Sequence, residues 1–243
     1  MITKRLLGAA LASCIAVWAA PAAAIPEIPE IPEIPEPMVF DMVRGLGASA
    51  GELEINALAT SPFSGQDRVV EWAPEIEYAV VDGLALEFEL PFENRRLTEL
   101  KLGVQGTLGT MDGGRMIHGL QYLGIYDRHD KSTSHALLYL LGRRHSERWS
   151  TMSMVGVGDV RVGQSEKVAG LLVNHTTFYN LNEKQIAALE LNFKSGPDGG
   201  LLAMPQFHTA LAKKVSLQLG TGLDKQRGAR ARPVGGLRLI REF

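Results

Sequence analysis

Apolar and polar residues alternate strictly along the stretch Trp72–Pro91, and this is the clearest pattern in the chain. One side of the alternation carries apolar and aromatic residues, and the other carries glutamates and alanines, with an interruption at Val81-Asp82-Gly83. A period of two is typical of strands with two different faces, so the stretch predicts a β-hairpin. A three-residue loop places Tyr78 opposite Leu86 and leaves Gly83 where such a loop needs a left-handed residue.

This pairing also places Glu77 opposite Glu87 and Glu75 opposite Glu89, which is unfavourable because like charges across a ladder repel. Two arrangements relieve the repulsion. In a soluble sheet, water screens the charges. In a membrane barrel, a polar interior supplies cations that balance them, while the apolar face meets lipid. The rest of the chain favours the second arrangement.

Strand-like segments separated by turn residues continue from residue 52 to the end of the chain. Most approach the roughly nine to eleven residues that a tilted strand needs to cross a bilayer, and none shows a helical period over three turns. We therefore predict an all-β fold, a transmembrane antiparallel up-and-down β-barrel of about 12 strands. Ten strands remain an alternative, because segments 114–126, 135–142 and 148–158 alternate poorly. The predicted strands are 52–60, 69–80, 84–91, 97–109, 114–126, 135–142, 148–158, 168–179, 185–194, 200–211, 214–223 and 231–243.

Residues 1–24 have the pattern of a secretory signal peptide. Lys4 and Arg5 precede an apolar run, and Ala22-Ala23-Ala24 provides an A-x-A cleavage site. The alternative is a lipoprotein, since Leu11-Ala12-Ser13-Cys14 resembles a bacterial lipobox, and lipidation of Cys14 is left open. Cleavage after Ala24 removes the chain's single cysteine, which excludes disulfide and thiol chemistry.

Residues 25–37 repeat Ile-Pro-Glu four times and end in proline. Proline at every third position favours an extended, polyproline-like conformation, so we expect an exposed spacer. A docking segment for a periplasmic or cell-wall partner is the alternative. Residues 38–51 form a short N-terminal segment, and both a short helical piece and an inner plug are compatible with it. The barrel itself occupies residues 52–243.

The chain ends in Gly-Leu-Arg-Leu-Ile-Arg-Glu-Phe, with Leu237 and Leu239 on one strand face and Phe243 at the terminus. This ending resembles the insertion signal of bacterial outer-membrane barrels, although Arg241 departs from its apolar pattern. Together with the signal peptide and the strands, it predicts a protein of the bacterial outer membrane. The expected partners are the barrel-assembly machinery, outer-membrane lipid and lipopolysaccharide.

Charge adds little to this prediction. The net charge of −2 and the expected export argue against nucleic-acid binding. A small basic cluster lies in and just after the last loop. It suits lipopolysaccharide phosphates at the outer rim, and a solvated loop fits the same residues equally well. The cluster consists of Lys225, Arg227, Arg230 and Arg232.

The segment Pro74–Phe92, P-E-I-E-Y-A-V-V-D-G-L-A-L-E-F-E-L-P-F, resembles the hairpin of a bacterial outer-membrane family named "MetA-pathway of phenol degradation". That family typically carries E-Y-G-L-T-D-R-L-E-L-E-L-x-L-P. Here Ala79 replaces its glycine, and Val81 and Gly83 replace its threonine and arginine. The resemblance covers the chain from about residue 51 onward and is sharp only in the hairpin. It implies a barrel that passes small molecules, and the family's name does not identify phenols as the substrate.

The polar residues that alternate with the apolar face are candidates for lining the lumen. Closure of the barrel brings the last strand beside the first, so Arg232 or Arg238 is expected to face Glu54. Charged walls in a narrow lumen focus a field and select ions, whereas in a filled barrel the same charges neutralise one another. The lumen-lining candidates are Glu54, Glu75, Glu77, Glu87, Glu89, Glu99, Lys101, Glu190, Lys194, Arg232 and Arg238.

We therefore expect an outer-membrane barrel that allows passage of small solutes through a charged lumen, with aromatic or hydrophobic compounds among them by the family resemblance. The alternative is a non-conducting structural barrel that anchors the proline-rich segment to a periplasmic or cell-wall partner.

No catalytic residue, cofactor or metal site is predicted. The histidines have no paired metal spacing, and we expect them at turns and in the lumen. His175-Thr176 and His208-Thr209 are neighbours within strands, so their side chains point to opposite faces and form no catalytic dyad. Neither a G-x-S-x-G motif nor a phosphate-binding loop occurs. The histidines are His118, His129, His135, His145, His175 and His208.

Overall fold

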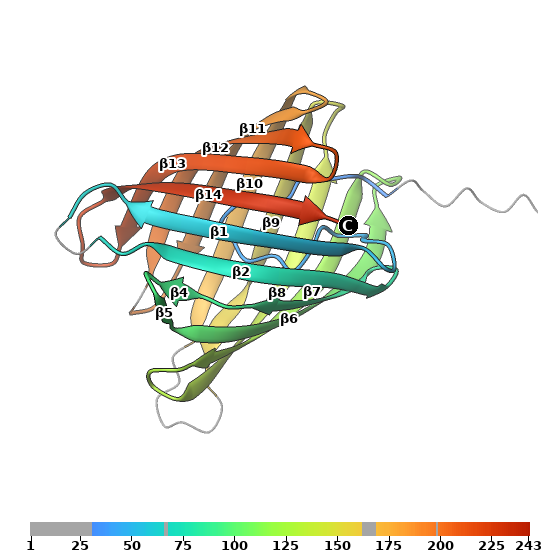
Figure 1. Cartoon of the computed structure of the whole chain (residues 1–243). Helices are drawn as coiled ribbons and strands as arrows, with labels where there is room; N and C mark the ends of the chain where they lie inside the picture. Colours follow the sequence, from blue (N-terminus) through green and yellow to red (C-terminus); the bar gives the residue numbers. More distant parts are fainter. Residues whose placement is uncertain (1–30, 66–67, 162–168, 198) are drawn as a thin grey trace, which may run out of the picture.

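The computed structural model describes residues 31–65, 68–161, 169–197 and 199–243, which form a closed antiparallel β-barrel (Figure 1). The predicted all-β barrel of twelve strands is confirmed, and the alternative of ten strands is wrong. The strands are β1 (Leu53–Pro62), β2 (Glu71–Val81), β3 (Leu84–Glu89), β6 (Glu99–Met111), β7 (Met116–Asp127), β8 (Ser132–Arg144), β9 (Trp149–Val160), β10 (Gly170–Asn182), β11 (Gln185–Lys194), β12 (Gly200–Ala212), β13 (Val215–Gln226) and β14 (Arg232–Glu242). Two short pieces, β4 (Phe92–Glu93) and β5 (Arg96–Leu97), extend β3 and β6.

The barrel closes because β1 pairs with both β2 and β14. Glu54 is aligned with Glu242 and Pro62 with Val234, so the first and last strands stay paired from end to end. β1 begins and β14 ends at the same end of the barrel, where the short hairpin turns also lie (Figure 1). We call this the turn end, and the opposite end, with the longer connections, the loop end.

The central hairpin has the predicted register. Glu75 lies opposite Glu89 and Glu77 opposite Glu87, and Gly83 is left-handed with a φ of 74°. The predicted three-residue loop is wrong, because Val81 pairs with Leu84 and the strand has a bulge between Ala79 and Val81. A bulge absorbs one extra residue, so a shorter turn produces the same facing of the glutamates.

The inner face of the wall differs between its two halves. β1–β3, β6 and β11–β14 turn mainly polar or charged side chains inward, whereas β7–β9 turn mainly apolar ones inward, and β10 is mixed, with Asn174 and Thr176 beside Phe178. Outward side chains are apolar and exposed on both halves. Segments 114–126, 135–142 and 148–158 alternate poorly because their strands carry apolar residues on both faces. The buried apolar residues of this half include Ile117, Leu123, Leu138, Leu140, Met152, Met154 and Phe178.

Residues 31–50, which we call the inserted segment, contain no helix or strand and lie inside the barrel (Figure 1, blue). Ile31 and Glu33 are exposed, as expected of a spacer, but the prediction is wrong for Pro32, Ile34 and Pro37, which are buried. Of the two alternatives for residues 38–51, the helical piece is wrong and the inner plug is observed. The repeat has apolar side chains at two of every three positions. The barrel wall, whose inner face is partly apolar, buries several of them.

The predicted signal peptide at residues 1–24, the lipobox at Cys14 and the repeat residues 25–30 lie outside the described residues. Within the part of the chain that the structure describes, no helix is long and apolar enough to cross a membrane.

Candidate functional site

The carboxylate of Glu190 on β11 holds the deepest part of the inserted segment. Its oxygens accept backbone N–H groups of Met38 and Val39 at 3.1 Å each and of Phe40 at 2.7 Å. The side-chain amides of Asn192 and Gln206 donate to the same carboxylate. Glu190 is fully buried, and the five donors replace the water that an ionised carboxylate would otherwise need.

Gln121 on β7 and Gln105 on β6 bind the backbone of residues 41–44 of the inserted segment. The Gln121 side chain accepts from the Val43 N–H at 3.0 Å and donates to the Asp41 carbonyl at 2.7 Å. Gln105 donates to the Arg44 carbonyl. These bonds satisfy backbone groups that helix or strand pairing would otherwise satisfy, which lets the segment stay irregular inside the barrel.

Arg44 brings a guanidinium into the acidic part of the lumen. It forms ion pairs with Glu52 at 3.2 Å and with Glu54, and its Nη1 lies 3.7 Å from Glu77. Burial lowers the pKa of Arg44, but the carboxylates of Glu36, Glu54 and Glu77 raise it, and the net pKa lies above the ordinary value. The inserted segment therefore contributes a positive charge that pairs with the glutamates of β1 and β2.

Arg238 on β14 supplies the second cation from the wall. Its guanidinium lies 2.8 Å from Glu75, 3.3 Å from Glu77 and 3.8 Å from Glu54. It also donates to the carbonyl of Pro37 at 3.2 Å. The prediction that an arginine of the last strand faces Glu54 thus describes Arg238, which is buried among carboxylates of β1 and β2.

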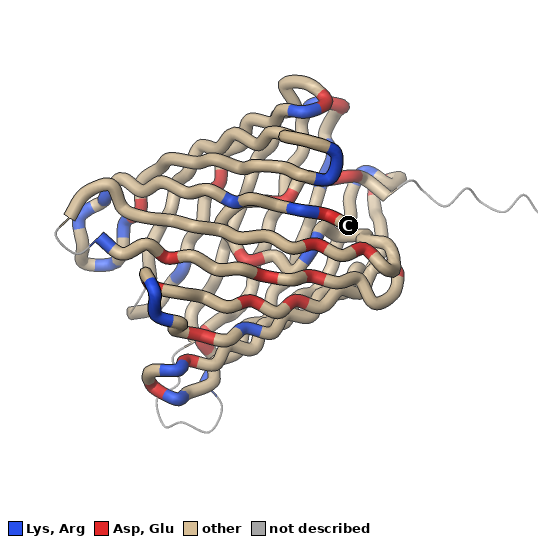
Figure 2. Tube along the Cα trace, in the orientation of Figure 1, with Lys and Arg blue, Asp and Glu red and all other residues tan. Residues whose placement is uncertain are grey.

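Lys101 on β6 supplies the third cation. Its Nζ lies 2.9 Å from Asp41 of the inserted segment and 2.9 Å from Glu89 on β3. Figure 2 shows acidic positions recurring along β1, β2 and β3. Lys101 lies on the neighbouring β6. Each of the three cations therefore touches both the barrel wall and the inserted segment.

Most apolar side chains of the inserted segment pack on the half of the wall that has apolar inner residues, and Met38 packs elsewhere. Phe40, Met42 and Val43 belong to the same buried cluster as the inner residues of β7–β10. Met38 lies against β13 and β14, where a β-carbon on Gly220 or Gly236 would come within 2.7 and 2.8 Å of its Cε. The glycines therefore provide the space that Met38 occupies.

A hollow of about 890 Å³ remains around the segment and is lined by residues of the turn end. Glu36, Arg44 and Glu54 line it, together with His208 and Gln218 of the wall. Water and ions therefore have room to approach the acidic part of the lumen from this end.

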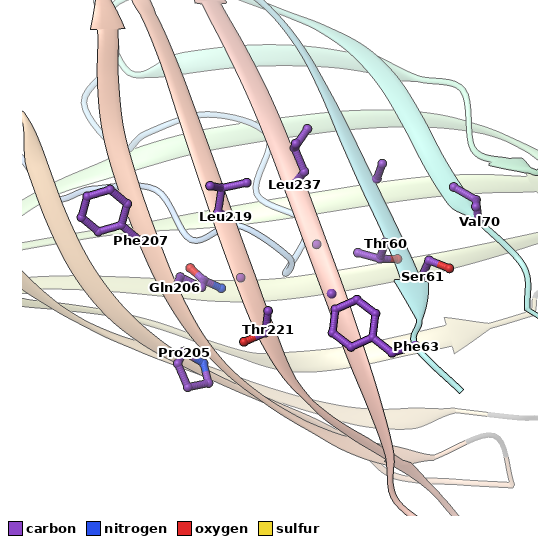
Figure 3. A pocket seen from close by; sticks show the side chains of 14 residues that line it. Thr60, Ser61, Phe63, Val70, Pro205, Gln206, Phe207, Leu219, Thr221 and Leu237 are labelled. Carbon is purple, nitrogen blue, oxygen red and sulfur yellow. The ribbon is translucent and has the colours of Figure 1, made fainter. Parts of the chain in front are cut away.

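A second hollow, of about 680 Å³, lies over β12–β14 and the end of β1 (Figure 3). Phe63, Phe207, Leu219 and Leu237 line it, and all four are exposed. The β13–β14 ladder is continuous in this region, whereas the β12–β13 pairing is interrupted between Ala203–Leu223 and Gln206–Gly220, where Pro205 has no N–H to donate. The exposed lining residues place the hollow on the outer face of the wall.

The sequence-predicted lumen residues fall into two groups. Those in contact with the inserted segment or its cations are Glu54, Glu75, Glu77, Glu89, Lys101, Glu190 and Arg238, and Glu87 lies buried among them. Glu99, Lys194 and Arg232 stand apart. Lys194 pairs with Asp159 at 2.6 Å, and the half-exposed Arg232 pairs with Asp224 at 3.1 Å. Sequence reasoning missed Glu36, because the repeat was predicted to be an exposed spacer. It missed Asp41 and Arg44, because residues 38–50 have no period that assigns their side chains to a face.

The histidine prediction is wrong for three residues. His118, His135 and His175 lie on strands with the outward residues, and each contacts a hydroxyl of a neighbouring strand: Tyr139, Tyr122 and Ser153. His208 is buried inward as expected and contacts Gln206.

Oγ of Ser153 on β9 lies 2.8 Å from Nδ1 of His175 on the neighbouring β10. Inspection of residues adjacent in the sequence could not find this pair, because its members come from different strands. The other nitrogen of His175 faces the Thr177 hydroxyl at 3.2 Å. A hydroxyl does not stabilise an imidazolium as the carboxylate of a hydrolytic triad does. The geometry thus gives the pair a role in satisfying polar groups on the outer face.

At the chain's end, Leu237 and Leu239 point outward and Phe243 is exposed, with its N–H bonded to the Leu53 carbonyl. Lys225, Arg227 and Arg230 are exposed at the end of β13 and in the connection to β14, at the loop end. Figure 2 shows basic positions clustered in the loops at this end. Recognition of these residues by assembly machinery or by lipopolysaccharide stays a prediction.

A family model described as HAEPLYID-like matches residues 33–140, less than half of the chain. The match begins within the inserted segment and ends in β8. No curated protein matches the chain. The resemblance to the phenol-degradation family is not confirmed by these comparisons.

Solved structures give a more decisive match. An outer membrane channel from Pseudomonas putida superposes with a TM-score of 0.64 at 14% identity, covering 82% of this chain and 97% of that one. The NanC porin gives a TM-score of 0.62 at 8% identity, covering 78% and 98%. The KdgM porin gives 0.58 at 10% identity, covering 76% and 97%. The fold is that of an outer-membrane porin barrel. At these identities the likeness concerns the fold alone, and it accounts for nearly the whole length of each porin.

Proposed function

We propose that this chain is an outer-membrane channel for small solutes, closed by the inserted segment and opened when that segment withdraws. The outward apolar faces of the strands suit a bilayer, which is the usual setting of this fold. All strand pairings of the wall lie between residues 53 and 242. Withdrawal of residues 31–50 would therefore leave the barrel closed as a cylinder.

The observation that carries the proposal is the contact of Glu190 with the backbone of the segment. Three N–H groups of residues 38–40 donate to one carboxylate on the wall. Water can replace such bonds when the lumen hydrates, whereas a segment paired as a strand would have to break a continuous ladder. The Glu190 contact thus helps to hold the segment in the lumen together with the bonds from Gln121 and Arg238, and no continuous strand ladder has to break when the segment withdraws.

The open lumen would have two unlike walls. Glutamates of β1–β3 form one, and Leu138, Leu140 and Met152 belong to the other. Such a passage favours small organic solutes with an apolar body and a neutral or positively charged polar group. This agrees with passage of hydrophobic compounds and adds a preference against anions.

A permanently plugged barrel is the second candidate, and the burial of the segment favours it. Met38, Phe40, Met42 and Val43 are at most 5% exposed. Returning such side chains to water costs about 1.5–3 kcal/mol each. In this case the barrel would not conduct and would instead hold the residues that precede the segment for a partner.

Planar-bilayer recordings of wild type and the Glu190→Ala variant separate the two candidates. Hydrogen bonds to a charged group contribute about 1.5–3 kcal/mol each, so their loss should raise the open probability at least tenfold. Glu190→Gln keeps an acceptor and should fall between the two. A folded Glu190→Ala barrel that stays silent would support the permanent plug.

A further inference from the structure

Glu87 on β3 is buried without a partner. Its side chain is 3% exposed, and neither carboxylate oxygen accepts a hydrogen bond from any described residue. An ionised carboxylate removed from water is strongly unfavourable unless a cation or several donors replace the water. The neighbouring glutamates do have such partners, so Glu87 requires its own explanation.

The surroundings of Glu87 are acidic on two sides. Carboxylate oxygens of Asp41, Glu87 and Glu89 lie within 4.8 Å of one another, and those of Glu75, Glu77 and Glu87 do the same. The cations in this group are Lys101, which contacts Asp41 and Glu89, and Arg238, which contacts Glu75 and Glu77. Arg44 is a further cation at the edge of this group, with Nη1 3.7 Å from Glu77. Five carboxylates thus meet three cationic side chains, and each of these cations pairs with carboxylates other than Glu87.

We propose that a calcium ion binds at Glu87, with oxygens of Asp41 and Glu89 and of the adjacent Glu75 as further ligands. Carboxylates are the ligands that hard divalent cations prefer. Calcium accepts six to eight oxygens in flexible geometry, which suits ligands from two strands and an irregular segment better than the strict octahedron of magnesium does. The earlier expectation of no metal site considered histidine spacing, which says nothing about carboxylates.

The site joins the two parts of the molecule that the channel proposal separates. Asp41 belongs to the inserted segment, whereas Glu75, Glu87 and Glu89 belong to the wall. Bound calcium would add a link between them and favour the closed state. This consequence rests on the proposed function, but calcium binding itself does not.

Calcium titration of the refolded mature protein in detergent at neutral pH tests the site, with isothermal calorimetry as the readout. We expect saturable binding of one ion per chain and a higher unfolding temperature with calcium. Glu87→Gln should abolish both effects, and Glu147→Gln, in an exposed turn, should leave both unchanged. Asp41→Asn provides a second test outside the barrel strands if Glu87→Gln fails to fold.

Two results would overturn the proposal. One is no binding by folded wild type up to about 10 mM calcium, above the range of weak extracellular sites. The other is unchanged binding by both Glu87→Gln and Asp41→Asn, which would place the ion elsewhere. Conductance measured with and without calcium reports separately on the link to closure. Binding without an effect on conductance would contradict the link between calcium and closure, and would leave both the site and the channel proposal intact.

Discussion

Nη2 of Arg238 on β14 lies 2.8 Å from Oε1 of Glu75 on β2, although β1 lies between these two strands. Nε of Arg238 donates to Asn56 on β1 at 3.1 Å. One buried guanidinium therefore connects three consecutive strands from inside, at the place where the barrel closes. It also reaches the inserted segment through the carbonyl of Pro37.

Replacement of Arg238 by methionine should destabilise the barrel. Removing one partner of a buried ion pair costs about 3–5 kcal/mol, because the remaining charges are left uncompensated. Arg238→Lys should recover only part of the loss, since an ammonium cannot serve several carboxylates and an amide with the planar geometry of a guanidinium. Urea unfolding followed by the heat-modifiable shift on gels gives the comparison. Equal stability of Arg238→Met and wild type would contradict this role.

Gly236→Ala should move the end of the Met38 side chain while leaving the wall intact. The added β-carbon would lie 2.8 Å from Cε of Met38 and 3.4 Å or more from Thr60 and Ala59, so the methionine must move. We expect the variant to fold and to lose no more than about 1 kcal/mol, the lower end of the usual cost of overpacking, because the end of the Met38 side chain can turn away. The double variant Gly236→Ala, Met38→Ala should cost less than the sum of the single changes. Additive losses would mean that the two residues do not meet.

The combined change Glu75→Gln and Glu87→Gln should reduce the cation preference of the open channel. Both side chains lie on the acidic wall, so their charge contributes to the field in the lumen. Reversal potentials in a salt gradient measure the preference. Gln substitutions at the exposed Glu147 and Glu183 are matched controls for total charge. Unchanged selectivity of an open channel would show that ions avoid this wall.

The strands and their faces follow from the sequence because alternation reports which side of a strand is polar. The facing pairs Glu75–Glu89 and Glu77–Glu87 needed only the hairpin register. The position of the inserted segment in the lumen could not be predicted from the sequence. Asp41 and Arg44 meet residues of β2, β3 and β6 far along the chain, and an irregular segment has no period that reveals such contacts.

The contacts of the uncharged polar side chains in the lumen could not be predicted from the sequence either. Gln105, Gln121 and Gln206 stand at inward positions and contact the segment or its anchor, but a lone amide on a strand gives no signal of a partner. Glu87 was predicted to face inward, whereas its lack of a partner depends on where Lys101 and Arg238 point. Only the three-dimensional structure shows the directions of these two side chains.

A disulfide between the inserted segment and the wall tests the gate. A β-carbon on Gly103 would lie 2.5 Å from Cγ2 of Val43, so the two β-carbons come within about 4 Å, the spacing of a disulfide. The expected cleavage after Ala24 removes Cys14, the chain's only cysteine, so the two introduced cysteines are the only thiols of the mature variant.

Single-channel conductance of the Val43→Cys, Gly103→Cys variant, before and after reduction, is therefore the most direct measurement. The gated-channel account predicts silence in the oxidised form, and openings like those of wild type once the disulfide is reduced. Equal conductance in both forms would contradict it, because ions would then pass with the segment locked in place. Silence of the reduced variant and of wild type would contradict it as well, and would identify the segment as a permanent plug.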